Sequence, residues 1–435
     1  MGKDTLVNYN KKVINAWAMY DWANSVYSLV ITSTIFPIYY AAVTTVGDDR
    51  MVKFLGLNFQ NSALYSYTIA FSFLLISILS PFLSGIADYG GLRKKFMQFF
   101  CYLGSLGCLI LFFFTSKENI GVGIFGFVIA TVGYAGSIVF YNSFLPEIAP
   151  VHMQDKVSAK GFAFGYIGSS ILLIINLVMV LFPQIFGFSD SATAPRISFL
   201  MVGLWWVGFA QIPFRRLPDN PQNRKTKGNY LFNGFKELLK VLNILKENRR
   251  LKLFLSSFFF FNMGVQTVMY VAALFGEQEL KLQSSELITT ILIIQFVAIG
   301  GAYLFSILSS RFGNFGALAI AIIIWIGICI GAYHVVDANG FYALAFVVGM
   351  VMGGIQALSR STYSKLLPET INHASFFSFY DVCERVGIVV GTAMYGIIIE
   401  ITGSMRNSVI ALALFFILGL VLLIRIPKTR VPHAV

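Results

Sequence analysis

The chain has 435 residues, of which 57% are hydrophobic and only 12% are charged, and its formal net charge is +12 at pH 7. Soluble globular chains carry about 25% charged residues, so this sequence has too few charges to cover a soluble surface. A stretch of about 20 apolar residues spans a bilayer. The composition therefore excludes a soluble enzyme, a nucleic-acid-binding domain and a disulfide scaffold, and it predicts a polytopic membrane protein.

The first long apolar run covers residues 13–43. It is too long for the core of a signal peptide, so we expect it to remain as the first spanning helix. Further runs of about 17 or more mostly apolar residues lie at 63–87, 96–115, 120–142, 157–182, 197–214, 252–275, 285–308, 317–336, 340–362, 375–400 and 404–426. The expected fold class is an all-α polytopic membrane protein with 12 transmembrane helices, and the even number places both termini on one side.

The basic residues predict which side that is. With cytoplasmic termini, most of the 32 lysines and arginines fall in cytoplasmic segments, and Arg385 is placed inside a helix. Six fall in outer loops: Arg50, Lys53, Lys117, Arg196, Lys281 and Arg406. This positive-inside bias accounts for most of the net charge, so we expect no nucleic-acid partner. The compact loops and short tails favour a bacterial inner membrane.

The longest polar stretch, 215–251, separates the sixth and seventh helices. Its apolar residues recur at steps of four and three, which predicts an amphipathic helix on the cytoplasmic surface, at Leu231, Phe235, Leu238, Leu242 and Leu245. The stretch therefore divides the chain into an N-terminal six-helix half, 1–214, and a C-terminal half, 252–435. We favour a tether between the halves over a sensing role for this linker.

An internal repeat supports two equivalent halves. The pattern Y-x-x-x-L-P-E occurs at Tyr141–Glu147 and again at Tyr363–Glu369, 222 residues later. The loop at Asp88 has its counterpart at Ser310, at the same offset. Parallel six-helix repeats are typical of one large transporter fold, in which the substrate site lies between the halves near the membrane midplane.

The loop after the second helix reads S-G-I-A-D-Y-G-G-L-R-K from Ser84 to Lys94 and resembles the loop signature of the major facilitator superfamily. Ser84 and Tyr89 depart from that signature. The glycines permit a tight turn, and the Asp88 carboxylate can accept hydrogen bonds from a helix N-terminus. The resemblance implies that this terminus lies near Ser375 and that the contact gates the cytoplasmic side. The predicted gating residues are Asp88, Gly91 and Arg93.

Polar side chains follow one face of the first, fourth, seventh and tenth helices, which line the central cavity in this superfamily. These stripes predict a site for a polar or zwitterionic small molecule, although serine, threonine and asparagine can also serve only to join helices. Asp21, Ser25, Ser28 and Thr32 form the first stripe. The predicted substrate-binding residues are Asn24, Ser25, Ser28, Tyr134, Tyr141, Asn262, Gln266 and Gln356.

Placing a charged group inside a membrane costs free energy, so each such residue is a candidate functional residue. The predicted proton-coupling residues are Asp21, Asp381, Glu384 and Arg385, which lie near the cytoplasmic ends of their helices and could share one depth. Asp381 and Arg385 are four residues apart and can neutralise each other within their helix. Glu384 and Asp21 then remain as lone carboxylates, which in a low-dielectric environment bind protons readily.

Longer stretches resemble one branch of the superfamily, the vacuole-effluxer-like branch. They include Tyr20–Ser25, Tyr141–Glu147, Asp155–Gly168 and Gly353–Ser361, and the resemblance runs from about residue 15 to 400. Fungal members are linked to amino-acid efflux from the vacuole, which implies an amino acid or short peptide as substrate. The chain departs from the branch in the seventh helix, where Asn-Met-Gly replaces Asn-Asp-Gly, and in the eleventh, where Cys-Glu-Arg replaces a continuation with Gly-Lys. The fourth helix also lacks the buried arginine of drug–proton antiporters, which argues against a multidrug pump.

The function predicted from these observations is secondary active transport of a small polar metabolite by alternating access, with efflux and proton coupling as hypotheses. No phosphate-binding loop of the G-x-x-x-x-G-K-[ST] type occurs, no enzymatic site is predicted, and no cofactor or metal is expected.

The four cysteines lie inside apolar runs, at Cys101, Cys108, Cys329 and Cys383. Expected partners are a small-molecule substrate, the lipid bilayer and protons, and the chain is expected to be a monomer. Two alternatives stay open: a lipid or lysolipid flippase, and a receptor or scaffold on a transporter fold.

Overall fold

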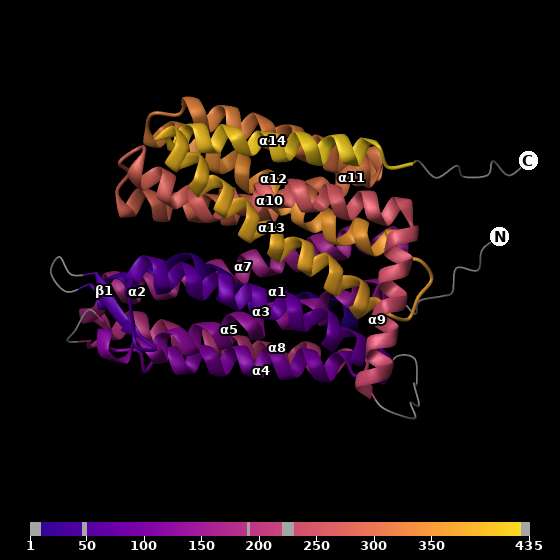
Figure 1. The fold of residues 1–435 in the computed structure, drawn as a ribbon, viewed down its shortest axis with the longest axis horizontal. Helices are drawn as coiled ribbons and strands as arrows, with labels where there is room; N and C mark the ends of the chain where they lie inside the picture. The colour runs from indigo at the N-terminus through magenta and orange to yellow at the C-terminus, as the bar shows by residue number, and fades with distance from the viewer. Residues whose placement is uncertain (1–9, 46–49, 189–191, 220–229, 428–435) are drawn as a thin grey trace, which may run out of the picture.

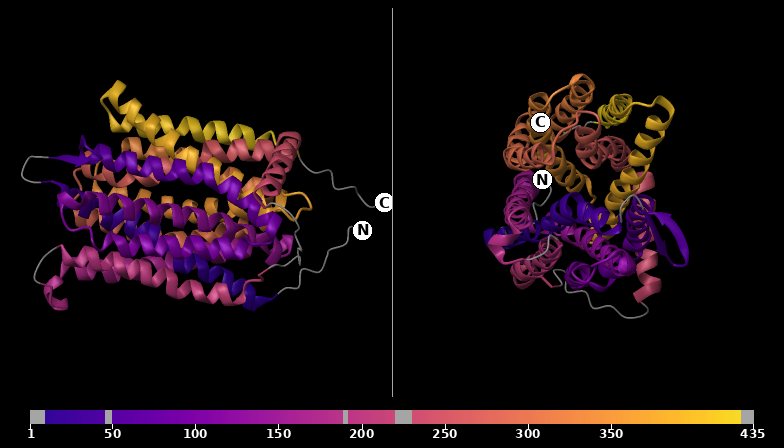
Figure 2. Two further views of the ribbon diagram at one scale, coloured as in Figure 1. Left: turned by 60° about the horizontal axis from the view of Figure 1, so that its bottom comes forward. Right: turned by 90° about the vertical axis from the view of Figure 1, so that its left-hand side faces the viewer.

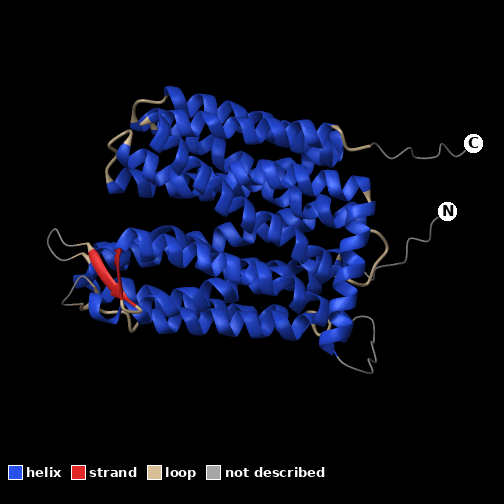
Figure 3. Ribbon diagram, viewed as in Figure 1, coloured by secondary structure: helices blue, strands red, loops and turns tan. Residues whose placement is uncertain are grey.

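A computed structural model of the chain describes residues 10–45, 50–188, 192–219 and 230–427. Most of these residues are helical, and the helices run side by side (Figures 1 and 3). The long helices are α1 (Lys11–Val26), α3 (Asn61–Gly90), α4 (Arg93–Leu111), α5 (Ile120–Ser143), α7 (Gln154–Leu181), α8 (Thr193–Arg216), α9 (Tyr230–Glu247), α10 (Arg249–Gln278), α11 (Ser284–His334), α12 (Ala338–Leu366), α13 (His373–Thr402) and α14 (Met405–Ile424). The expected all-α polytopic architecture is confirmed.

Shorter elements complete the described chain. They are the π-helix η1 (Tyr27–Ile35), α2 (Phe36–Thr44), α6 (Leu145–Ile148) and the 3-10 turns η2 (Lys117–Asn119), η3 (Val151–Met153) and η4 (Pro183–Phe186). An antiparallel hairpin of β1 (Met51–Phe54) and β2 (Leu57–Gln60) lies at the end of the bundle opposite α9 (Figure 3).

In the described chain, 10 helical segments are long and apolar enough to cross a membrane. Two of the twelve expected spans, 285–308 and 317–336, lie in α11, because only Gly313 breaks the helix between them. Gly313 has φ 71°, a value that glycine adopts without steric cost. The expected span 96–115 is not among these ten segments. It corresponds to α4, whose first three residues are basic.

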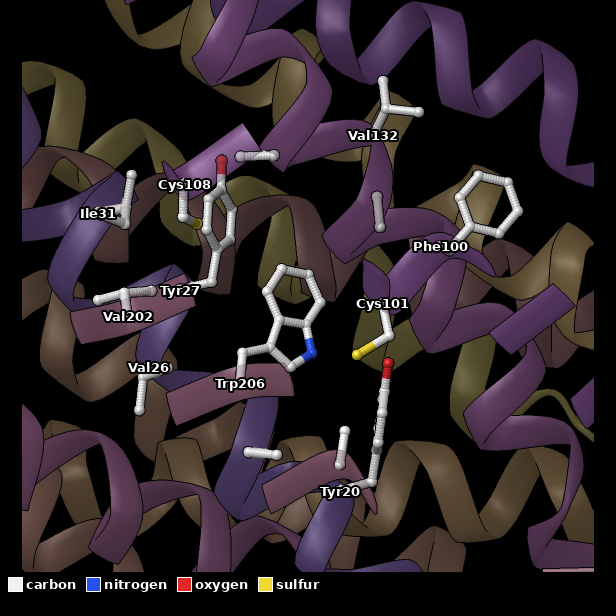
Figure 4. Close-up of a cluster of buried hydrophobic side chains, with 14 of the residues drawn as sticks. Tyr20, Val26, Tyr27, Ile31, Phe100, Cys101, Cys108, Val132, Val202 and Trp206 are labelled. Carbon is white, nitrogen blue, oxygen red and sulfur yellow. The ribbon is translucent and has the colours of Figure 1, made fainter. Parts of the chain in front are cut away.

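The helices form two bundles that meet near the end where α9 lies and diverge toward the other end (Figure 1). Figure 2 shows that α1–α8 and α10–α14 occupy separate halves of the molecule. Each half has its own apolar core, one drawn almost entirely from residues 14–217 and the other from residues 241–426. Cys101 and Cys108 lie in the first core near Tyr20, Tyr27 and Trp206 (Figure 4), and no ligand role is needed to explain them.

The first helix changes its winding at Tyr27. In η1 the hydroxyl of Ser33 donates to the carbonyl of Ser28 at 2.9 Å, and Thr34 donates to that of Leu29 at 2.7 Å, each five residues back. This is the wider repeat of a π-helix, which occurs often at functional sites. The α-helical spacing expected along the first polar stripe is therefore wrong beyond Tyr27.

Small residues bring α11 and α12 together. A Cβ atom at Gly349 would lie 2.6 Å from the carbonyl oxygen of Ile294, and one at Gly353 would overlap that of Ala298. Close backbone approach at glycines spaced four apart is a common way to pack helices in membranes.

We therefore expect Gly349→Leu to destabilise the protein by about 1–3 kcal/mol through overpacking. Thermal unfolding of the purified protein in detergent would measure the loss. Gly300→Leu is the matched control, because a Cβ at Gly300 meets no atom within 4 Å. Equal melting temperatures for the two variants would contradict the packing argument.

Candidate functional site

Polar contacts join the two halves at the end of the bundle where α9 lies. Asp88, in the last turns of α3, is 1% exposed and caps the start of α13. Its Oδ2 accepts from the backbone N–H of Ser375 at 2.7 Å, and Oδ1 accepts from that of Ala374 at 3.2 Å. A carboxylate at a helix N-terminus is stabilised by the orphan N–H groups and the helix dipole. This is the contact expected for Asp88 from the sequence.

The turn after Asp88 places the neighbouring basic residues. Gly91 has φ 64° and ends α3, so the chain turns at once into α4. Arg93 forms an ion pair with Glu147 and lies 3.6 Å from Asp88. Glu147 in turn contacts Nδ1 of His373 at 2.9 Å. Arg93 thus connects the Asp88 turn to α6, and through Glu147 to the start of α13.

Arg360 forms a polar cluster between the halves and is not among the site residues predicted from the sequence. It lies inside α12 and is only 3% exposed, so Arg385 is not the only basic residue inside a helix, contrary to what the distribution of lysines and arginines had suggested. The guanidinium donates to Oδ2 of Asp21 at 3.2 Å and to the carbonyl of Ser158 at 2.8 Å. The signal was its position within the predicted span 340–362. Its partner Asp21 is 339 residues away, so no local pattern could pair them.

Asp21 is therefore not a lone carboxylate. Besides Arg360, it accepts a hydrogen bond from the hydroxyl of Tyr141 at 2.7 Å. Tyr141 stacks on Trp17 with ring centroids 4.5 Å apart, and the guanidinium of Arg360 lies 4.7 Å from the Trp17 ring. We call the residues that converge here, Trp17, Asp21, Tyr141, Asn142, Ser158 and Arg360, the Arg360 cluster.

A second ion pair links the halves beside the Arg360 cluster. Lys365 of α12 contacts Oδ2 of Asp155, in the first turn of α7, at 2.6 Å. Asn314 and Ser309 of α11 also donate to the carboxylate of Asp155, each at 2.8 Å. Gln356 belongs to this interface as well, because it accepts from the hydroxyl of Tyr166 at 2.6 Å.

The other predicted charged residues, Asp381, Glu384 and Arg385, lie together on α13. Arg385 pairs with Asp381 at 2.9 Å within α13, as their spacing suggested. Glu384 accepts from Nε2 of Gln266 in α10 at 3.1 Å and is partly exposed. Tyr134 of α5 has both Arg385 and Glu384 among its electrostatic neighbours. We call Tyr134, Gln266, Asp381, Glu384 and Arg385 the central polar group.

The central polar group and the Arg360 cluster each include a tyrosine of α5. Tyr134 belongs to the first and Tyr141 to the second, and seven residues of α5 separate them, a rise of about 10 Å. This separation concerns the two tyrosines, and the expectation that Asp21 and Glu384 share one depth stays a prediction.

The other predicted binding residues lie on α1, η1 and α10. Ser25 and Ser28 bond mainly within their own segment. Asn24 and Asn262 are 1% and 5% exposed, and within the described ranges the side-chain N–H₂ group of each has no hydrogen-bond partner. A buried donor without a partner costs about 1–3 kcal/mol, so these amides can gain from a polar ligand. Among the residues that the structure describes, no group of three or more His, Cys, Asp or Glu could hold a metal ion.

The fold together with the relatives given below identifies a transporter of the major facilitator superfamily. Two solved structures cover nearly the whole chain: the human organic anion transporter MFSD10 (TM-score 0.71, 11% identity, 95% of this chain and 99% of that one) and the transporter FucP (TM-score 0.70, 14% identity, 96% and 100%). These likenesses concern the fold alone.

The sequence profile of the family described as vacuole effluxer Atg22 like matches residues 9–432. The uncharacterized MFS-type transporter YxiO of Bacillus subtilis (strain 168) is 33% identical over 416 residues, covering 95% of this chain and 94% of YxiO. Autophagy-related protein 22 of Yarrowia lipolytica is 23% identical over 87% of this chain and 78% of its own length. The chain belongs to the Atg22-like vacuole effluxer family.

The Arg360 cluster generates a stability prediction. Arg360→Gln leaves the Asp21 carboxylate buried without its cation, and we expect a loss of about 3–5 kcal/mol. The double variant Asp21→Asn with Arg360→Gln removes both charges, so it should unfold at a higher temperature than Arg360→Gln alone. Thermal unfolding in detergent would compare them. The single variant Asp21→Asn would be measured as well. If the loss of stability in the double variant equals the sum of the two single losses, the Arg360 and Asp21 side chains do not stabilise each other.

The Asp88 cap generates a conformational prediction. Asp88→Asn removes the negative charge at the start of α13, which is worth about 1–2 kcal/mol in a buried setting and shifts an open–closed equilibrium by about 5- to 30-fold. Spin labels at Lys156→Cys and Arg311→Cys, both exposed and on opposite halves, would report the separation in a Cys383→Ser background.

We expect a longer distance population in the Asp88→Asn protein. Asp219→Asn is the matched control, because the Asp219 side chain, at the start of the linker, is largely exposed and pairs with Lys94 rather than with the C-terminal half. An unchanged distance distribution in Asp88→Asn would contradict the gating role.

Proposed function

We propose that this chain exports a small polar metabolite with an amino group, an amino acid or a short peptide, in exchange for protons. The observation that carries the proposal is the position of Glu384, a partly exposed carboxylate whose contact with Gln266 links α13 to α10. The description of its family as effluxers supports the direction of transport.

The charge of the central polar group supports an ammonium-bearing substrate. The Arg385 and Asp381 side chains neutralise each other at 2.9 Å, so Glu384 leaves one negative charge in excess. An ammonium group placed near Glu384 would complete that balance, and the ring of Tyr134 lies nearby. The unpartnered amide groups of Asn24 and Asn262 are donors suited to a substrate carboxylate.

Proton coupling follows if the ammonium and a proton use the same carboxylate in turn. Glu384 binds the substrate amine when ionised and releases it when protonated, so inward proton movement drives substrate outward. Asp21 takes a different part in this proposal. Because Arg360 and Tyr141 hold it between the halves, Asp21 stabilises the closed arrangement rather than carrying protons.

The gate follows from the same arrangement. The positive-inside bias supports cytoplasmic termini, and with that orientation the polar interface described above closes the cytoplasmic side. Opening that side requires Asp88 to leave the N–H groups of Ala374 and Ser375 and requires Arg360 and Lys365 to leave their carboxylate partners. We propose that the protein works as a monomer in a cytoplasmic membrane.

The test is binding and flux by purified protein, with radiolabelled amino acids and dipeptides as probes. For the wild type we expect substrate affinity to rise with pH, because a proton and the ammonium compete for Glu384. In Glu384→Gln that pH dependence should vanish, and flux driven by a pH gradient should fall by at least about tenfold, since a hydrogen bond to a charged group is worth about 1.5–3 kcal/mol.

Two controls separate coupling from folding. Glu384→Asp keeps the charge and should keep the pH dependence, and Glu400→Gln alters an exposed carboxylate of the same helix. A wild-type protein that binds these substrates with no pH dependence would overturn the coupling. If neither amino acids nor peptides bind or exchange, the amino-acid proposal is wrong, and lipid transport becomes the next function to test.

A further inference from the structure

A groove of about 340 Å³ lies between α9, α10 and α13, near the end of the bundle where the halves meet. Its walls are mostly apolar, with Leu255, Phe259 and Phe260 on α10 and Cys383 on α13. Two cations also line it, Lys246 near the end of α9 and Lys252 in the first turn of α10. No residue of the central polar group or of the Arg360 cluster lines this groove.

The charges of the groove are unbalanced. Its lining contains no carboxylate, and in the described parts of the chain neither Lys246 nor Lys252 forms an ion pair. Both lysines are exposed, so their ammonium groups are accessible. The groove therefore favours an anion.

The apolar wall extends away from these cations along the helix. Phe259 and Phe260 follow Lys252 by seven and eight residues, which places them about 10 Å further along α10. Since α10 is a candidate membrane span that begins at Arg249, we expect the lysines at the level of the lipid headgroups and the phenylalanines at the level of the acyl chains. A ligand that satisfies both ends of the groove is an amphiphile with an anionic head.

The linker helix α9 also supports a position of the groove at the membrane interface. Phe232, Phe235 and Leu239 are exposed large apolar side chains, and Lys236 lies 4.4 Å from the Phe232 ring. A helix with exposed aromatic and aliphatic side chains beside lysines is typical of segments that lie in the membrane interface. Basic pockets beside membrane-spanning helices on the cytoplasmic side, the side proposed above for this end of the bundle, are suited to anionic lipid headgroups.

We propose that this groove is a binding site for an anionic phospholipid of the leaflet at the end where the halves meet. Lys246 and Lys252 bind the phosphate, and Phe259 and Phe260 contact the first part of an acyl chain. The bound lipid would contact both the linker helix and α13, whose N-terminus Asp88 caps. The lipid is a resident ligand rather than a transported one, so the proposal does not depend on the substrate.

Cys383 provides a reporter of occupancy at this groove. It is partly exposed, whereas Cys101, Cys108 and Cys329 are buried. The rate at which N-ethylmaleimide modifies Cys383, read by mass spectrometry of the peptide, would be measured in detergent with added phosphatidylglycerol, phosphatidylcholine or inorganic phosphate. We expect phosphatidylglycerol to slow the modification and the other two to leave it unchanged.

The lysines are then tested directly. The double variant Lys246→Gln with Lys252→Gln should raise the phosphatidylglycerol concentration for half-protection by about 30-fold, since each lysine near an anionic lipid contributes about fivefold. Lys240→Gln, on the same helix outside the groove and already paired with Glu237, should change it by less than about twofold. Arginine at both positions should preserve protection. Melting temperatures would verify that each variant is folded.

Several results would overturn the proposal. Equal protection by phosphatidylcholine would mean that the groove does not select charge, and protection by phosphate alone would mean that the apolar wall plays no part. Unchanged protection in the folded double variant would mean that the lysines do not bind the lipid. These measurements do not involve transport, so they stay separate from the test of the proposed function.

Discussion

A guanidinium buried between two helical bundles needs hydrogen-bond acceptors in place of water, and Arg360 finds them in the opposite bundle. It belongs to the C-terminal half, yet its hydrogen-bond partners Asp21, Asn142 and Ser158 all belong to the N-terminal half. A buried ion pair contributes little net stability compared with apolar packing, whereas breaking one partner is costly. The interface is therefore specific when closed, and its polar groups can be hydrated when the halves separate.

Helix α13 connects the parts of the molecule on which the proposals rest. Its first turn is capped by Asp88, its middle carries Asp381, Glu384 and Arg385, and Cys383 of the same helix lines the groove beside α9. Because an α-helix moves largely as a rigid body, a change at the central polar group and a change at the Asp88 cap act on one element. We infer that substrate, gate and lipid influence one another through α13.

The linker helix is packed against both halves, so it is more than a chain of suitable length. Gly234 lies against the backbone of α3 at Ile86, where a Cβ atom would meet the amide nitrogen at 2.7 Å. On one side Asn233 donates to the hydroxyl of Tyr89, and on the other Glu237 accepts from Asn372, which precedes α13. Figure 1 shows α9 running across the end of the N-terminal bundle and up to α10. The tether favoured from the sequence thus contacts the gate, although a sensing role stays untested.

The sequence by itself determined the fold class and the spans, because each depends on a local signal, the hydropathy over one helix. The Asp88 cap was expected only from the resemblance of its loop to the signature of the superfamily, since its partners lie 286 and 287 residues away. The sequence also determined the Asp381–Arg385 pair, whose partners are one helical turn apart. Only the tertiary structure decided that Asp21 is paired with Arg360, that Tyr141 belongs to this cluster, and that Glu384 contacts Gln266 of α10. These facts depend on the register between helices far apart in the chain. That register is set by side-chain packing across the two bundles, and a linear pattern of polar and apolar residues does not contain it.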